Sequence, residues 1–260
     1  MAQGDVSIGV AGTLGPEAIA KLAPVVESAG FHALWVNDTP GGDSISALEA
    51  AAETTDSLVL CTGVIPVDRR GADTIVAAVQ RAELPEHRLV LGVGSGATRR
   101  GALSLVAEAV DALHEGLSAR VLLGALGPKM RRLGAQNADG VLLSWLTPDI
   151  ATGQAQEAHG LASDAHVALY VRTAVEPSAS ATLQREVERY GGYPAYAANF
   201  QRLGIAAQQT VLDPDTFGAG ILRYRDAVDE VVLRVITADS LDAHVVFVER
   251  AAELLAQPPA

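Results

Sequence analysis

The chain has 260 residues, of which 49% are hydrophobic, so it is long enough to bury a substantial core. Its formal net charge of −12 argues against an extended basic surface for nucleic acid or an anionic membrane. The start "MAQGDVSIGV" has no basic segment followed by an apolar one, and no apolar run approaches the length of a membrane span. We therefore expect a cytoplasmic protein whose partner is a small molecule, with no nucleic-acid or membrane partner.

Cysteine and histidine usage argues against a metal site. The single cysteine, Cys61, lies in an apolar run and is expected to serve packing only. The six histidines are scattered without the spacing that metal ligation needs. No metal cofactor is expected.

Short apolar runs alternate with helical patterns along the whole chain, which is typical of repeated βα units. The first helical stretch follows an apolar run and has Pro16 at its first position and Gly30 as its C-terminal cap. Further helical material between residues 178 and 225 lengthens one connection. The predicted strands are residues 6–12, 33–37, 58–64, 89–94, 120–126, 140–146, 166–174 and 230–237.

Eight strands with intervening helices predict a (β/α)8 TIM barrel. An open doubly wound sheet is the alternative, because its strands are equally apolar when both faces are covered. No Pro/Gly/Ser-rich linker or charge block divides the chain. We therefore expect one domain over residues 1–260.

Residues 89–96, "LVLGVGSG", end the fourth predicted strand with Gly92, Gly94 and Gly96. A Rossmann fingerprint needs the spacing G-x-G-x-x-G and an early position, whereas these glycines are spaced G-x-G-x-G in mid-chain. The glycines either allow a tight turn at the end of a barrel strand or let backbone N–H groups and Ser95 approach an anion closely.

Basic residues gather after three successive predicted strands. On a barrel these positions share one rim, and they oppose the helix dipoles there, so they predict a local positive arc for a phosphorylated or polyanionic ligand. Solvated side chains at helix starts are the alternative for any single pair. The arc comprises Arg69, Arg70, Arg99, Arg100, Lys129, Arg131 and Arg132.

Polar residues also follow other strands. Asn37, Asp38 and Thr39 end the second strand, and Ser144 and Trp145 lie at the end of the sixth, with Thr147 before Pro148. These side chains can face a ligand at the carboxyl ends of the strands or simply cap the next helix. No Ser-His-Asp order, metal cluster or carboxylate pair supports hydrolysis.

Several segments together resemble the luciferase-like flavin and deazaflavin oxidoreductases, which include FMN-dependent monooxygenases and enzymes that use coenzyme F420. The matching segments are "ESAGFHALWVND", "TDSLVLCTGV", "HRLVLGVGSG", "GALGPKMRRLGAQNADGVLLSWLTP", "YPAYAANFQRLGI" and "VDEVVLRVIT". The resemblance implies a (β/α)8 barrel with a ring cofactor at its mouth.

Carried over residue by residue, the resemblance implies that Asp38 lies beside the ring and that Gly63–Val64 is a non-prolyl cis peptide behind it. The phosphate side of the cofactor would be held by Gly94, Ser95, Gly96, Gly127, Pro128, Lys129 and Met130. Substrate contacts would come from Ser144, Trp145, Thr147 and Arg234.

Two departures from the family concern proton transfer and the cavity mouth. Many members have a histidine directly after the strand-two aspartate, where this chain has Thr39; Asp38 and Thr39 are therefore the candidate catalytic residues, with a water as an alternative proton carrier. The family insertion before the fifth strand is also shortened. The mouth is therefore expected to be more open, or to be covered by residues 178–225.

The function expected from these features is F420-dependent hydride transfer to or from a small organic substrate. The positive arc suits the phosphate and oligoglutamate tail of F420. FMN-dependent oxidoreductase or monooxygenase activity is one alternative, and a non-catalytic flavin-binding barrel is another. Family members often form dimers, which makes a homodimer the candidate assembly.

Overall fold

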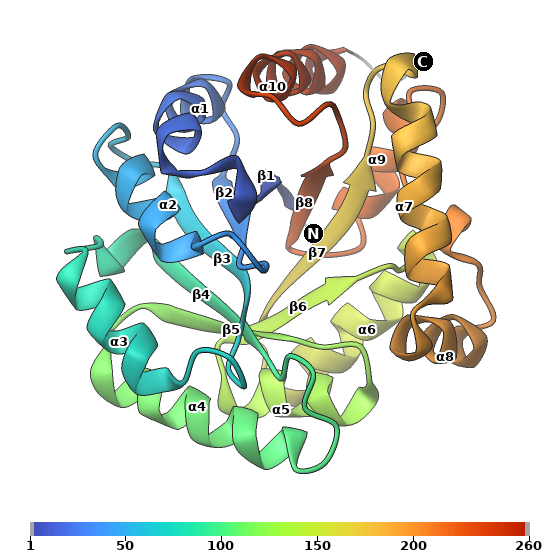
Figure 1. Cartoon of the computed structure of the whole chain (residues 1–260). Helices are drawn as coiled ribbons and strands as arrows, with labels where there is room; N and C mark the ends of the chain where they lie inside the picture. The colour runs from blue at the N-terminus through green and yellow to red at the C-terminus, as the bar shows by residue number, and fades with distance from the viewer. Residues whose placement is uncertain (1–2, 258–260) are drawn as a thin grey trace.

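The computed structural model describes residues 3–257 and shows eight parallel strands closed into a barrel in chain order (Figure 1). Pairing of the first strand with the last closes the ring, which confirms the predicted (β/α)8 barrel over the open sheet. The strands are β1 (Asp5–Ala11), β2 (Ala33–Asn37), β3 (Val59–Pro66), β4 (Leu89–Gly94), β5 (Arg120–Gly124), β6 (Gly140–Ser144), β7 (His166–Thr173) and β8 (Glu230–Val235).

All eight predicted strands are confirmed. β2 and β4 have the predicted bounds, and the others differ by one or two residues at an end. The differences concentrate at the carboxyl ends, where apolar residues continue past the last paired residue. Leu146, for example, is buried although β6 ends at Ser144.

Helices surround the barrel. Pro16 begins α1 as predicted, and Gly30 follows the helix end with a φ of +79°, a conformation that glycine adopts without strain. The helices are α1 (Pro16–Ser28), α2 (Ser44–Ala52), α3 (Ala72–Arg81), α4 (Ala102–Gly116), α5 (Pro128–Asn137), α6 (Pro148–Leu161), α7 (Ser180–Gly192), α8 (Pro194–Leu203), α9 (Phe217–Arg225) and α10 (Leu241–Ala256), with short 3-10 turns η1 (Gly12–Leu14), η2 (Glu86–Arg88), η3 (Pro177–Ala179) and η4 (Ala207–Thr210).

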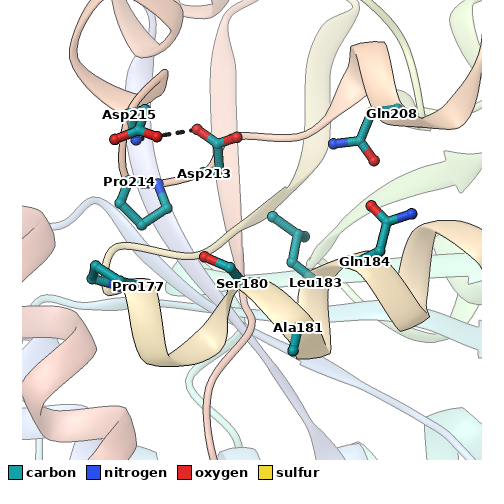
Figure 2. A pocket seen from close by; sticks show the side chains of 9 residues that line it. All are labelled: Pro177, Ser180, Ala181, Leu183, Gln184, Gln208, Asp213, Pro214 and Asp215. Carbon is teal, nitrogen blue, oxygen red and sulfur yellow. Dashed lines mark hydrogen bonds between the residues drawn. The ribbon is translucent and has the colours of Figure 1, made fainter.

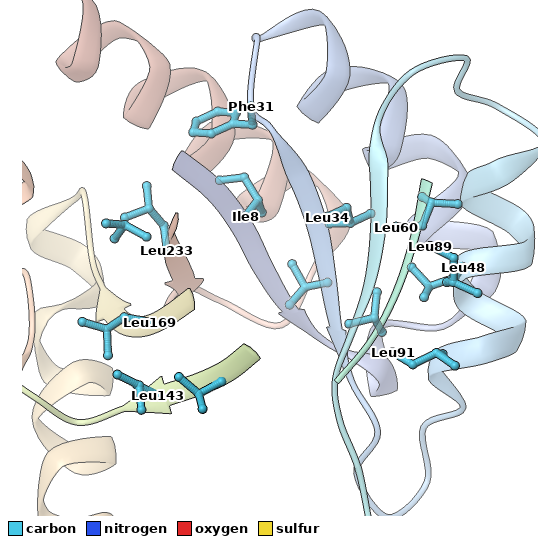
Figure 3. Close-up of a cluster of buried hydrophobic side chains, with 14 of the residues drawn as sticks. Ile8, Phe31, Leu34, Leu48, Leu60, Leu89, Leu91, Leu143, Leu169 and Leu233 are labelled. Carbon is cyan, nitrogen blue, oxygen red and sulfur yellow. The ribbon is translucent and has the colours of Figure 1, made fainter. Parts of the chain in front are cut away.

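The core has an outer and an inner layer because successive strand residues point to opposite faces. Leu34 belongs to the large cluster between strands and helices, part of which Figure 3 shows, while its neighbour Trp35 points into the barrel. There Trp35 meets Tyr170 edge to face, with ring centroids 5.9 Å apart. Cys61 also belongs to this inner layer, and burial raises the pKa of its thiol well above the usual value. Its expected packing role is confirmed.

One carboxylate is buried within the barrel. Glu230, at the start of β8, accepts hydrogen bonds from the Ser7 hydroxyl at 2.5 Å and the Trp35 indole at 2.6 Å, and its other oxygen lies 2.9 Å from Nε2 of His166. Burial alone would raise the pKa of Glu230, but these partners together lower it below its usual value. The arrangement ties β1, β2, β7 and β8 together.

The predicted long connection runs between β7 and β8 and contains η3, α7, α8, η4 and α9. In Figure 1, α7 and α8 (orange) lie beside one another at the edge of the barrel. Leu183 of α7 and Phe200 of α8 join Trp145, just beyond β6, in a separate hydrophobic cluster. The connection is therefore packed on the carboxyl ends of the strands. Within residues 3–257, no helix combines the length and apolar character needed to cross a membrane.

Candidate active site at the barrel mouth

A cavity of about 350 Å³ opens at the carboxyl ends of β2 to β7. Its volume falls in the range of small-molecule sites, roughly 300–1,000 Å³. Of the residues predicted for the site, Asp38, Thr39, Gly63, Val64, Gly94, Ser95, Gly96 and Ser144 line it. It is also lined by Asn37, Pro66, Gly124, Ala125, Leu126, Leu142, Leu143, Tyr170, Arg172, Tyr190 and Tyr196.

Val64 forms a platform in this cavity. The Gly63–Val64 peptide bond is cis, as the resemblance implied. A Cβ added at Gly94 would lie 3.0 Å from a methyl of Val64, and one at Gly124 would lie 2.8 Å from the other. Both glycines therefore leave the space that the Val64 side chain fills.

Asp38 lies against the cavity, but arginines hold its carboxylate. Arg69 donates hydrogen bonds to the backbone carbonyl and to one carboxylate oxygen of Asp38. Arg70 approaches the other carboxylate oxygen at 3.5 Å. The hydroxyl of Ser44 adds a hydrogen bond of 3.0 Å. These partners fix the position of Asp38, and a proton moved through its carboxylate would have to displace one of them. Thr39 lines the cavity beside it.

The loop after β4 carries a carboxylate of its own. Asp68 accepts a 2.7 Å hydrogen bond from the backbone N–H of Ala97. Gly96 has a φ of +60°, and a Cβ there would lie 1.8 Å from the Asp68 carboxylate. The glycine at position 96 is thus required both by its backbone conformation and by the close approach of Asp68.

The predicted positive arc is smaller than expected. Arg69 and Arg70 pair with Asp38, and Arg70 also with Asp43, which raises the pKa of Arg70. Arg131 is buried and pairs with Glu157 at 2.6 Å. The sequence could not distinguish these structural ion pairs from ligand-binding cations. Four exposed members, which form no ion pair with residues 3–257, make up what we term the β4–β5 rim: Arg99, Arg100, Lys129 and Arg132.

The other residues predicted for cofactor and substrate lie around the cavity rather than in its lining. Gly127, at the N-cap, and Pro128, Lys129 and Met130, in the first turn of α5, follow the lining residue Leu126. Thr147 occupies the N-cap position of α6, although its side chain accepts no capping hydrogen bond. Trp145 is buried with a φ of +59°, and Arg234 donates hydrogen bonds to the carbonyls of Gly9 and Val235.

The lining residues that the sequence interpretation missed include one arginine and three tyrosines. Tyr170 and Arg172 alternate on β7, so the two-residue period of a strand could have placed both on the inner face. Tyr190 and Tyr196 come from α7 and α8, and the sequence indicated only that residues 178–225 were available as a cover. Residues 178–225 thus contribute to the cavity wall, as one of the two expected forms of the mouth requires.

A second pocket, of about 510 Å³, is lined by residues of the connection between β7 and β8 (Figure 2). Ser180 and Gln184 of α7 line one side, and Gln208 and Asp213 line the other. The Asp213 carboxylate accepts hydrogen bonds from the backbone N–H groups of Asp215 and Thr216 and from the Thr216 hydroxyl, just before α9. Its acceptor capacity thus serves local structure, and the mouth cavity is the stronger candidate site.

Residues 2–100 match the family model for luciferase-like monooxygenases. Residues 2–100 are thus luciferase-like. The complete barrel is similar to the coenzyme F420-dependent tetrahydromethanopterin reductase of Methanopyrus kandleri, with 19% identity and a TM-score of 0.77 over 98% of both chains. It is also similar to an F420-dependent secondary alcohol dehydrogenase in complex with an F420–acetone adduct, with 14% identity and a TM-score of 0.74 over 96% of this chain and 99% of the other. A riboflavin lyase with modified FMN has 10% identity and a TM-score of 0.66 over 98% of this chain and 91% of the other. At these identities the similarity to the solved structures shows the shared barrel.

The mouth cavity fits a flat ring cofactor. Gly94 and Gly124 border the Val64 platform without side chains of their own. Two buried polar atoms beside it, Oδ1 of Asn37 and the hydroxyl of Tyr170, have no hydrogen-bond partner among residues 3–257. Burial raises the pKa of Tyr170, so its hydroxyl keeps its proton and remains a donor.

Proposed function

We propose that this protein is an F420-dependent oxidoreductase that transfers a hydride between the deazaflavin and a small organic substrate. The observation that carries the proposal is the Val64 platform, bare because Gly94 and Gly124 carry no side chain, beside the exposed cations of the β4–β5 rim. The bound cofactor would supply the hydride chemistry, while the chain orients the ring and the substrate.

The roles of the residues follow from their places in the cavity. Val64 would support one face of the ring, and Asn37 and Tyr170 would offer hydrogen bonds at its edge. The loop of Gly94 to Gly96 and the first turn of α5 would approach the phosphate side. Asp38, held by Arg69 and Ser44, would orient the ring or a water rather than deliver a proton by itself.

F420 is favoured over FMN because the β4–β5 rim lies beside the expected phosphate side and can attract a longer anionic tail. The two F420-dependent proteins of similar structure support the same choice. FMN remains the alternative, supported by the neighbour with modified FMN. The paired Asp38 and the threonine at position 39 favour the second alternative, a flavin-binding barrel without turnover.

Equilibrium titration with F420 and, separately, FMN tests the proposal. We expect micromolar binding of F420 and about tenfold weaker binding of FMN, a difference of about 1.4 kcal/mol. The double variant R99A/R100A should weaken F420 binding about three- to tenfold at low salt and less at high salt, because exposed charges are screened. R81A/R120A removes two exposed arginines from elsewhere on the barrel and is the matched control.

The outcomes separate the alternatives. If FMN binds more tightly than F420, FMN becomes the assigned cofactor. If neither binds at micromolar concentration, the hypothesis of a flavin or deazaflavin cofactor is wrong. Reduced F420 should then be oxidised in the presence of at least one member of a panel of ketones, enones and imines. Binding without any turnover would favour the non-catalytic barrel.

A further inference from the structure

Two arginine side chains, one buried and one partly buried, lie on neighbouring strands at the carboxyl end of the barrel. Arg172 of β7 and Arg234 of β8 are register partners on neighbouring strands. Burial and the charge of Arg172 lower the pKa of Arg234, against smaller opposite effects of Tyr170 and Glu186. Glu186 itself pairs with Arg189, and among residues 3–257 neither Arg172 nor Arg234 forms an ion pair with a carboxylate. This end of the barrel therefore holds two positive charges without a direct counter-ion.

The two arginines differ in how their donors are satisfied. Arg234 donates through Nη1 to the carbonyls of Val235, at 2.9 Å, and Gly9, at 3.5 Å. Arg172 is 7% exposed, and within the described chain the only hydrogen bond of its side chain goes to the Ser144 hydroxyl. Its Nε is fully buried and has no partner there. Of the two arginines, Arg172 is the one that lines the cavity, and its guanidinium has a single side-chain acceptor among the described residues.

Aromatic rings position the Arg172 guanidinium without satisfying its N–H groups. Its central carbon lies 4.3 Å from the ring centroid of Trp145 and 4.9 Å from that of Tyr190. Such stacking offsets part of the cost of burying the charge, but the in-plane donors still need acceptors. A carboxylate is the acceptor that best matches the planar fork of a guanidinium.

The surroundings indicate what such an anion is attached to. Tyr190 and Tyr196 line the cavity from α7 and α8, and Leu142 and Leu143 line it from β6. The walls near Arg172 are thus apolar and aromatic, which suits a flat hydrocarbon body. Ser144 and Arg172 are at the ends of β6 and β7, whereas the glycine loop and the β4–β5 rim follow β4 and β5. The anion is therefore recognised away from the expected phosphate side.

We propose that Arg172 binds the carboxylate of the substrate, and that the substrate class is small organic acids with a planar aromatic or conjugated body. The inference rests on the proposed function, since it assigns the substrate side of the same cavity. Arg172 acts here as a specificity-determining residue that fixes the orientation of the substrate. Tyr190 and Tyr196 would cover its planar body.

Ligand binding to the complete chain tests this with benzoate as the probe and benzamide as its neutral counterpart. Titrations are followed by calorimetry and by Trp145 fluorescence, with and without F420. Benzoate should bind about tenfold more tightly than benzamide to the unmodified protein. R172Q should abolish this preference while leaving the affinity for F420 within about twofold. R185Q, an exposed arginine of α7 that donates to Thr182, is the matched control and should keep the preference.

A second variant covers the case in which R172Q fails to fold. Y196L removes the covering ring but keeps the guanidinium, so it should weaken benzoate and benzamide alike and leave their ratio unchanged. Equal binding of the two probes to the unmodified protein overturns the inference. So does a loss of F420 affinity in R172Q as large as the loss of benzoate affinity, because the guanidinium would then serve the cofactor. Benzoate selectivity through Arg172 without binding of F420 or FMN would sustain this anion site while the proposed function fails.

Discussion

Asp68 accepts a 2.7 Å hydrogen bond from the backbone N–H of Ala97, so a carboxylate already lies against the glycine loop after β4. A phosphate that approaches the same loop meets a negative charge there. Replacing Asp68 by asparagine keeps an acceptor for Ala97 and removes that charge. D68N should therefore tighten the binding of F420 or FMN about two- to fivefold at low salt, as expected for one exposed charge.

Riboflavin, which lacks the phosphate, provides the ligand control and should bind D68N and the unmodified protein equally. D111N removes an exposed carboxylate from α4, and should change neither affinity. A D68N protein that binds the phosphorylated cofactor more weakly would mean that the ordered loop matters more than its charge.

Gly94 and Gly124 should tolerate no side chain without loss of cofactor binding. An alanine methyl would lie 3.0 Å from Val64 at position 94 and 2.8 Å at position 124, so the Val64 platform must shift. We expect each variant to lose about 1–3 kcal/mol of unfolding free energy, as overpacked sites do. Urea unfolding measures this loss of unfolding free energy. Titration with F420 should show a parallel loss of affinity.

Gly71→Ala is the matched control for this pair. A Cβ at Gly71 meets no atom within 4 Å, and its φ of −63° suits alanine. Because Gly71 is the N-cap of α3, where glycine is favoured over alanine, stability should fall by no more than about 0.5–1 kcal/mol, and F420 binding should not change. Undiminished F420 binding in both G94A and G124A would show that Val64 does not support the ring.

The barrel could be predicted from the sequence because each strand is a short apolar run with a clear end. β4, read from "LVLGVG", has the predicted bounds because every residue in it is buried and a glycine-rich loop follows. The bounds of α1 could be predicted because a proline begins the helix and a glycine follows its end, and both signals lie in the helix sequence itself. Local patterns of this kind need no knowledge of which strands are neighbours.

The electrostatics of the site could not be predicted in the same way, because they depend on contacts between distant loops. Arg69 lies 31 positions from Asp38, and nothing local indicates that the two pair. Arg131 likewise looks like any cation in the first turn of a helix, yet it is buried against Glu157. Tyr190 and Tyr196 enter the cavity only because α7 and α8 pack on the mouth of the barrel.

Introducing the histidine that many family members have should change the pH dependence of turnover. Thr39 lines the cavity next to Asp38, so a histidine there would face the same space. T39H should add an inflection near pH 6.5 to the rate profile, because that is the ordinary pKa of histidine. T39N, which adds a polar group of similar size without a titratable proton, is the control. Identical profiles for T39H and T39N would exclude proton transfer from this position.

Glu230 should make stability depend on pH in the acid range. Its pKa in the folded protein is lowered from 4.5, so the stabilisation from its partners is fully present above that value and is lost as pH falls through the lowered folded pKa. E230Q should cost about 3 kcal/mol at neutral pH, because His166, Ser7 and Trp35 lose a buried charged acceptor. Urea unfolding from about pH 5.5 to about pH 3 should show the two proteins converging in stability as the carboxylate is protonated.

The control is E249Q, which changes an exposed glutamate of α10. Its stability should stay a constant amount from that of the unmodified protein over the same pH range. A constant gap between E230Q and the unmodified protein over this range would contradict the lowered pKa and leave only a packing role for Glu230.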